Sequence, residues 1–590
     1  MQRHRIVLLA AGIASLTACV TACSRPPSPR FEVSFPASLS AQPVTGHLFI
    51  SVYDKDDAEP RIAAYQSSRD FVARVPFFAV DVDSLKPGES AVVDTTATGY
   101  PLPGGLASLP AGDYYVQAVM NVYTEYHRAD GHTVWARQGD WDGQRWAYAP
   151  GNLVSQPVKV HLDPAKGFDV KLALDHALPP VELPPDTRFV KRFKMQSPML
   201  TKWWGGAPQF LGATVLLPKG YDAHPNTHYP VLYLQDHFTL EAPYRFTEDT
   251  TPKRSRNVAV VLEPPNPRSN VESANPWSGG GLRESGHEFY KSWMSDHFPG
   301  MIIVTFQHPT QFFDDSYAVN SVNDGPYGDA ILQELIPEVE KRFRIIQAPY
   351  ARVLSGGSTG GWESLALQLY HPDFFGGTWT FFPDPIDFRR YQLTDIYADT
   401  SYFTQPNAAP GAPERMMQMN SPDGQPMATS RAVEQMEYAS GTKLRSAWQF
   451  DVWNVVYGPI GDDGYPKRLF DPKTGVIDHA VANSMRENGY DLRYYVHQNW
   501  SKIGPQLVGK LHILCGDMDD FYLSPAVYMM QDELESQTNP AYGGDFRYGR
   551  PMKGHGWSPM TNANLIREMA AHIAKNAPPG APTAAWRDGR

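Results

Sequence analysis

The pattern of apolar and polar residues divides the chain into two parts of different character. Between residues 31 and about 178, short runs rich in β-branched and aromatic residues, such as HLFISVYD and DYYVQAVMNVYTEY, are separated by turns such as LKPGES and LPAGDY. No long helical period interrupts these runs. The pattern predicts an all-β, sandwich-like domain over residues 31–178.

The second part follows a proline-rich stretch, in which we interpret residues 179–187 as a linker. From residue 188 onward, apolar runs typical of strands buried on both faces, such as GMIIVTFQHP, alternate with segments of helical spacing, such as DAILQELIPEVEKRF. This alternation predicts a parallel-rich α/β sheet over residues 188–580. Residues 384 to about 505 fit no such alternation, and we expect an inserted cap of helices and loops there.

Composition narrows the class of protein. The 590 residues are 42% hydrophobic and 19% charged, which is typical of a globular chain with room for more than one domain. The formal net charge of -11, with no basic block to override it, argues against nucleic acid as a partner.

The N-terminus has the features of an export signal. A short basic start is followed by an apolar run rich in small residues, too short for a transmembrane span, so residues 1–23 are predicted to be a signal peptide. Cys19 in LTAC and Cys23 in VTAC each resemble the cysteine of a lipobox, and either is a candidate for lipidation. We expect a periplasmic or cell-surface protein that reaches the membrane only through this lipid, with residues 24–30 as a tether. The remaining cysteine, Cys515, has no evident partner, so disulfides are not expected.

The segment VLSGGSTGGWESLALQLY contains the clearest candidate for chemistry. Ser358 lies between an apolar strand-like run and a helical segment, and the residues around it are glycines. A nucleophile on a sharp strand-to-helix turn needs such small neighbours, and the helix N-terminus favours developing negative charge. We therefore predict Ser358 as a nucleophile and the Thr359 N–H as an oxyanion donor.

A serine nucleophile on a strand-to-helix turn needs a histidine base and a carboxylic acid. Along the chain, the Asp or Glu follows the serine, and the His follows the Asp or Glu. Of the two histidines that remain downstream, His572 falls within a helical segment, whereas His555 lies in the glycine-flanked loop KGHGW. We predict His555 as the general base. For the acid we prefer Asp519, which lies three residues after Gly516 in a G-x-x-D spacing. Asp517, which directly follows this glycine, is its rival.

Three motifs in order, LPKGYDAHPNTHYPVLYLQDHF, YGDAILQELIPEVEKRFRI and GGSTGGWESLALQLYHPDFFGG, resemble the putative esterase family of α/β-hydrolases, which includes S-formylglutathione hydrolases, enterochelin esterases and feruloyl esterases. The resemblance covers roughly residues 190–383 and 508–575 and implies ester hydrolysis without a metal or other cofactor. Family members commonly read His-Gly where this chain has Asp236 and His237, so the matching second oxyanion donor is the N–H of Phe238. His237 is a candidate for substrate contact or for a hydrogen-bonded loop residue.

The sequence thus favours a serine esterase that cleaves carboxylic esters through an acyl-enzyme. Two alternatives are a peptidase resembling prolyl oligopeptidases, whose propeller the N-terminal part is too short to form, and a non-catalytic binding lipoprotein that keeps the hydrolase shape. His308, Asp314 and Asp315 follow a predicted strand and are candidates to line the pocket, but as metal ligands they lack a partner at a convincing spacing.

Overall fold

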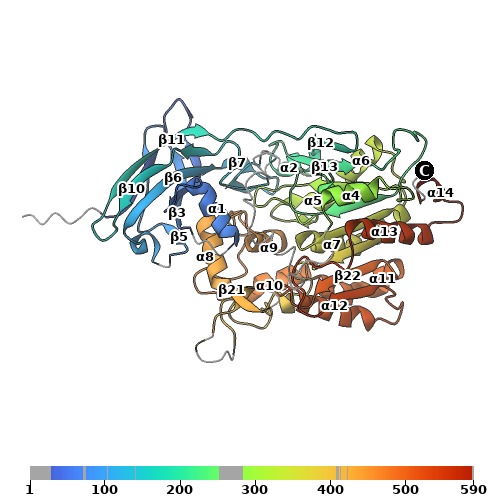
Figure 1. Ribbon diagram of the computed structural model, residues 1–590. Coiled ribbons are helices and arrows are strands. Elements are labelled where there is room, and N and C mark those ends of the chain that lie inside the picture. Colours follow the sequence, from blue (N-terminus) through green and yellow to red (C-terminus); the bar gives the residue numbers. More distant parts are fainter. Residues whose placement is uncertain are drawn as a thin grey trace, which may run out of the picture.

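The computed structural model shows two sheet-containing parts side by side, with the insertion of the second part lying between them (Figure 1). It describes residues 28–70, 75–102, 104–139, 141, 143–250, 284–406, 411, 413–420 and 423–587. The predicted signal peptide, with Cys19 and Cys23, lies outside the described residues. Within these ranges, the structure contains no helix with the length and apolarity needed to cross a membrane.

The N-terminal part is built on a sheet to which nine of its described strands belong. These are β1 (Arg30–Ser34), β2 (Val44–Tyr53), β3 (Phe77–Leu85), β4 (Ser90–Asp94), β5 (Thr98–Tyr100), β6 (Gly112–Val122), β9 (Leu153–Ser155), β10 (Val158–Leu162) and β11 (Asp169–Ala177). They follow the order β4-β1-β11-β9-β6-β2-β3-β5, with β10 on β6. Phe31 and Val33 of β1 share one core with Leu48 and Ile50 of β2, so the sheet curls around its own apolar face.

A helix in this part departs from the sequence prediction. Residues 60–70 form α1 (Pro60–Asp70), although no helical period was expected before residue 180. Its apolar side is made by Ile62 and two alanines, which pack with Phe49 and Trp146 in a second small core. Small residues give a weak periodic signal, which explains the miss. The hairpin of β7 (Thr124–His127) and β8 (Thr133–Ala136) extends from this part toward the second sheet.

The second part contains a sheet of eight described strands. These are β12 (Val190–Gln196), β13 (Phe210–Leu216), β14 (Val231–Gln235), β15 (Ile302–Gln307), β18 (Arg352–Gly357), β19 (Gly377–Phe381), β22 (Leu511–Gly516) and β23 (Asp545–Gly549). The order is β12-β13-β15-β14-β18-β19-β22-β23, antiparallel as far as β15 and parallel from there on. This is an α/β-hydrolase-like arrangement, in which the carboxyl ends of the parallel strands meet at one edge.

Helices cover both faces of this sheet (Figure 1). They are α2 (Pro198–Trp203), α4 (Gly286–Trp293), α5 (Tyr327–Ala330), α6 (Ile336–Arg342), α7 (Thr359–Tyr370), α11 (Leu492–Leu507), α12 (Ser524–Glu535), α13 (Asn562–Asn576) and α14 (Ala584–Arg587), with a π-helical turn at Ile331–Leu335. Strand β22 shows why two layers form: Leu511, Ile513 and Cys515 enter one core and Leu514 enters the other. Cys515 is a free, buried thiol.

The insertion between β19 and β22 contains α8 (Ser430–Ser440), α9 (Gln449–Tyr457), α10 (His479–Glu487) and a hairpin of β20 (Met416–Asn420) and β21 (Gln425–Thr429). The hairpin departs from the predicted helices and loops. Helix α11 begins inside the range expected for the cap but packs against α7 and α12 as a sheet-covering helix. Its Gly504 and Pro505 interrupt the helical pattern in the sequence. Helix α8 packs against β3 and β5, so the insertion joins the two parts.

A second contact between the parts is made by the segment TKWWGG. It forms the end of α2 and the turn that follows. Trp204 is fully buried against Tyr126 of β7, and Trp203 lies under the Arg128 guanidinium at 5.3 Å. The segment is therefore an interface.

Candidate active site

Ser358 lies on a strained turn between β18 and α7, at the carboxyl edge of the sheet. Its backbone has φ 58° and ψ -120°, a conformation that residues other than glycine rarely adopt. The turn is possible because its neighbours lack side chains: a Cβ on Gly356 would lie 2.2 Å from the Gly360 carbonyl oxygen, and one on Gly360 would lie 2.2 Å from the Gln235 oxygen. The turn therefore presents the Ser358 hydroxyl at the start of α7.

The Ser358 hydroxyl faces a carboxylate that was not considered from the sequence. Ser358 Oγ donates to Asp384 Oδ1 at 3.4 Å, and among the described residues no hydrogen bond joins it to His555. Asp384 Oδ2 accepts hydrogen bonds from Tyr317, Thr359, Gln449 and Trp453. Burial raises the pKa of Asp384, although the hydrogen bonds from Tyr317 and Thr359 oppose the shift.

His555 and Asp519 form a pair beside this turn. His555 Nδ1 lies 2.8 Å from Asp519 Oδ2, and Asp519 is fully buried. Asp519 Oδ1 accepts the Phe521 N–H at 2.9 Å, which fixes the carboxylate plane. Burial acts to lower the pKa of His555, but the charge of Asp519 and its hydrogen bond raise it above 6.5.

Phe382 links this pair to the turn at Ser358. Its ring lies 4.7 Å from the His555 ring, and a Cβ on Gly357 would touch the same ring at 2.7 Å. His555 and the residue before Ser358 therefore contact one side chain.

The two rival residues have structural roles. Asp517 Oδ1 accepts the Lys553 N–H at 3.0 Å and so holds the loop that carries His555. His572 lies in α13, where its Nε2 is 3.0 Å from the Gly376 carbonyl oxygen and its ring meets Trp379 edge-on. The two aspartates thus differ in their contacts: Asp519 pairs with the His555 ring, whereas Asp517 accepts a backbone N–H.

The loop after β14 lies directly against the Ser358 turn, since a Cβ on Gly360 would lie 2.2 Å from the Gln235 carbonyl oxygen and 3.1 Å from the Asp236 backbone nitrogen. Thr359 is the first residue of α7, where backbone N–H groups have no partner within the helix. Phe238 follows β14 by three residues and its side chain is buried. Both predicted oxyanion donors therefore belong to segments that meet at Ser358.

The N-terminal part covers this loop. Trp141 is 5% exposed and meets the Phe238 ring edge-on, with centroids 5.4 Å apart. A Cβ on Gly143 would lie 3.2 Å from the Phe238 Cβ, and Gln144 Nε2 donates to the Thr310 carbonyl oxygen at 2.6 Å. No signal in the sequence tied Trp141 to this loop, because the contact joins two parts separated by the linker.

His237 contacts two carboxylates of the loop after β15. Its Nδ1 lies 2.9 Å from Asp315 Oδ2 and 3.4 Å from Asp314 Oδ1. Burial acts to lower the pKa of His237, but the two carboxylates raise it well above 6.5. Of the two roles considered for His237, these contacts support that of a hydrogen-bonded loop residue. They do not depend on a bound substrate.

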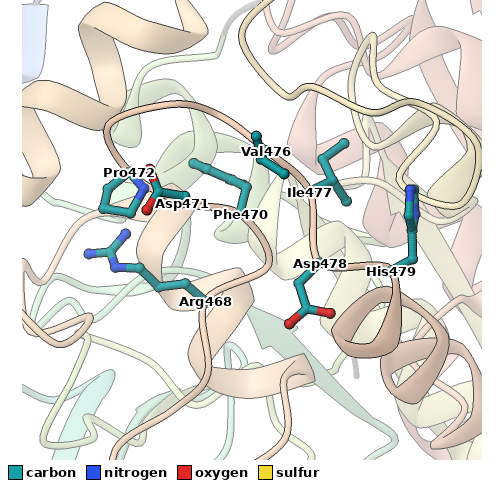
Figure 2. A pocket seen from close by; sticks show the side chains of 8 residues that line it. All are labelled: Arg468, Phe470, Asp471, Pro472, Val476, Ile477, Asp478 and His479. Atoms are coloured by element: carbon teal, nitrogen blue, oxygen red, sulfur yellow. The ribbon is translucent and has the colours of Figure 1, made fainter.

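A separate cavity of about 560 Å³ lies in the insertion (Figure 2). Its polar groups already have structural partners: Asp478 caps α10 by accepting the Ala480 N–H at 2.9 Å, and His479 Nδ1 lies 3.2 Å from the Ile396 carbonyl oxygen. Neither Ser358 nor His555 lines it. We therefore place the candidate chemistry at the sheet edge and not in this cavity.

Residues 209–383 match the model of the family described as Putative esterase, a range that includes β13 to β19 and the Ser358 turn. The matched range is less than half of the chain. It supports the identification of the chain as an esterase. The family match thus agrees with the resemblance expected from the three sequence motifs.

The esterase also resembles solved structures at low identity. A ferulic acid esterase is 14% identical, with a TM-score of 0.31 and coverage of 68% of this chain and 99% of that one. S-formylglutathione hydrolase from Agrobacterium tumefaciens is 12% identical, with a TM-score of 0.31 and coverage of 67% and 99%. No curated protein matches the chain. The family match, and not these likenesses, supports ester hydrolysis.

Proposed function

We propose that this chain is a serine esterase in which Ser358, His555 and Asp519 form a catalytic triad. Ser358 Oγ attacks the ester carbonyl carbon and passes its proton to His555 Nε2, while Asp519 holds the ring through Nδ1. The alcohol leaves with the proton from His555, and water then cleaves the acyl-enzyme by the same steps in reverse order. The N–H groups of Thr359 and Phe238 stabilise the tetrahedral oxyanion.

The observation that carries this proposal is the strained turn at Ser358 together with the His555–Asp519 pair, whose carboxylate is fully buried. A Gly-rich turn without chemistry would have no reason to hold a serine at φ 58°, since glycine takes that conformation without cost. The start of α7 adds partial positive charge at the position where the oxyanion develops. These features are the ones that acyl transfer requires.

Reaction with a fluorophosphonate probe tests the nucleophile. The wild-type chain should be labelled and Ser358→Ala should not be. Ser355→Ala is the matched control, because Ser355 lies three residues earlier on β18 and its hydroxyl donates to the Trp379 carbonyl oxygen at 2.8 Å. Equal labelling of wild type and Ser358→Ala would reject Ser358 as the nucleophile.

A substrate screen separates the alternative functions. Turnover of p-nitrophenyl esters without cleavage of peptide amides favours the esterase over the prolyl-oligopeptidase-like peptidase. Labelling without turnover of any substrate favours the non-catalytic binding protein.

We also propose that the esterase is exported and anchored by a lipid on Cys23 or Cys19, on the basis of the basic, apolar and lipobox-like order of residues 1–23. The N-terminal sheet would then lie between the anchor and the catalytic part. Mass spectrometry of the mature N-terminus identifies the modified cysteine by its diacylglyceryl mass. An N-terminus without this mass would reject the anchor.

A further inference from the structure

A group of side chains beside the oxyanion loop has the composition of a metal site. His237 follows β14, while Asp314 and Asp315 follow β15, so the adjacent parallel strands bring together residues that are far apart in the sequence. One nitrogen or oxygen atom from each of the three lies within 4.8 Å of the others. His237 is the partner that the sequence spacing of the two aspartates did not reveal.

The distances suit direct coordination. Ligand atoms around a tetrahedral Zn²⁺ with bonds of ~2.1 Å lie ~3.4 Å from one another. His237 Nδ1 is 3.4 Å from Asp314 Oδ1 and 2.9 Å from Asp315 Oδ2. Asp315 is held in place because its other oxygen accepts the Tyr317 N–H at 3.2 Å, and it is 1% exposed. The His237 side chain is 40% exposed, which leaves a path for an ion to enter.

Glu363 gives an independent reason to expect a cation. It lies in α7 and is fully buried, and no N–H or hydroxyl group of the described residues donates to its carboxyl oxygens. Its carboxyl group faces that of Asp315. His308 Nε2 lies 3.9 Å from Glu363 Oε1, too far for a hydrogen bond, and has no hydrogen-bond partner among the described residues. Two buried carboxyl groups that face each other cannot both carry a charge unless a cation lies beside them; without one, they share a proton, because burial and the neighbouring carboxylate raise the pKa of Glu363 well above its ordinary value.

A second buried acidic group shows the contrast. Glu434, Glu437 and Asp451 also come within reach of one another in the insertion. There, Arg468 contacts Glu434 at 2.6 Å and Asp451 at 3.3 Å, and Glu437 accepts two backbone N–H groups. The Arg468 guanidinium cannot lose its proton to a metal ion, whereas the His237 imidazole can, so we assign no ion to that cluster.

We propose that His237, Asp314 and Asp315, with Glu363 behind them, bind a divalent transition-metal cation beside the esterase site. One imidazole with carboxylates suits Zn²⁺ or Mn²⁺ better than Ca²⁺, which prefers oxygen ligands alone. The ion would attach the residue before Phe238 to the loop after β15. Its role would be to position the oxyanion loop, and the metal takes no part in the proposed acyl transfer.

The metal content of the untagged full-length chain tests this. After treatment with EDTA and dialysis against Zn²⁺ or Mn²⁺, elemental analysis should find about one ion per wild-type chain. His237→Ala and Asp314→Asn should lose it, and Glu363→Gln should bind it 10- to 100-fold more weakly. The matched control is His161→Ala, because His161 and Asp113 form an exposed pair at 2.7 Å without a third ligand.

Ser358→Ala should retain the ion, which makes this result independent of the proposed nucleophile. Near-wild-type circular dichroism of Asp314→Asn, a change at a side chain that keeps 13% exposure, separates loss of a ligand from loss of the fold. Wild-type protein that retains no metal would overturn the proposal. So would metal that is retained equally by His237→Ala, or Ca²⁺ that binds independently of His237.

Discussion

Trp141 reaches from the N-terminal part onto the loop that carries Phe238, so Trp141→Ala tests whether this contact supports catalysis. The Trp141 ring is 5% exposed, meets Phe238 edge-on, and lies 5.0 Å under the Lys194 ammonium group. Gly212 leaves room for it, because a Cβ there would lie 2.3 Å from the indole. Alanine would remove the side chain that covers the Phe238 ring.

The expected loss follows from this burial. A buried tryptophan covers ~200 Å² of surface, which at ~25 cal/mol per Å² corresponds to ~5 kcal/mol. Trp→Ala changes in protein cores cost about 3–5 kcal/mol in the free energy of unfolding, and we expect a value in this range. An oxyanion donor displaced by a freed loop should lower kcat by about 10- to 100-fold, less than the 10²- to 10³-fold that follows outright removal of a donor.

The assay is steady-state hydrolysis of a p-nitrophenyl ester, with the concentration of folded sites counted by fluorophosphonate titration. Trp146→Ala is the control: Trp146 is 1% exposed and stacks on Phe49 at 4.1 Å, within the N-terminal part and away from Phe238. It should lower stability by a similar amount and leave kcat per folded site unchanged. If Trp141→Ala also leaves kcat unchanged, the contact does not support the oxyanion loop.

Three further outcomes follow from the same geometry. Asp519→Asn should lower kcat about 10⁴-fold in steady-state assays, because an amide favours the wrong tautomer of His555, and a fall below tenfold would contradict its role. Because the pKa of His555 is raised above 6.5 and the base acts unprotonated, kcat/KM should be highest in mildly alkaline solution and fall with acidification through a midpoint above 6.5; a midpoint below 6.5 in the pH–rate profile would refute this. Gly360→Ala should lower the free energy of unfolding in urea by about 3 kcal/mol or more, since its Cβ would meet the Gln235 carbonyl oxygen, and a stability equal to wild type would show that the turn can yield.

Local patterns in the sequence were enough to predict much of the second part, which carries Ser358. The apolar runs that become β15 and β22 are continuous because both faces of a parallel sheet are covered, and that feature is visible in the residues themselves. The glycines around Ser358 point to its turn for a steric reason that needs no partner from elsewhere. The mixed segment 492–507 shows the limit, since Gly504 and Pro505 hid a sheet-covering helix.

The sequence by itself indicated the alternation of strands and helices around Ser358 and the glycine-rich turn at that residue, because periodicity and small-residue requirements act between neighbours in the chain. Tertiary structure alone decided the contacts between distant segments. It pairs His555 with Asp519 and not Asp517, and it brings Asp384 to Ser358. It also places Trp141 on Phe238 and His237 beside two distant aspartates. Each of these contacts depends on where loops from separate strands end. Strand order and loop path are set by packing of the whole sheet, and they leave no periodic signal in the residues that finally touch.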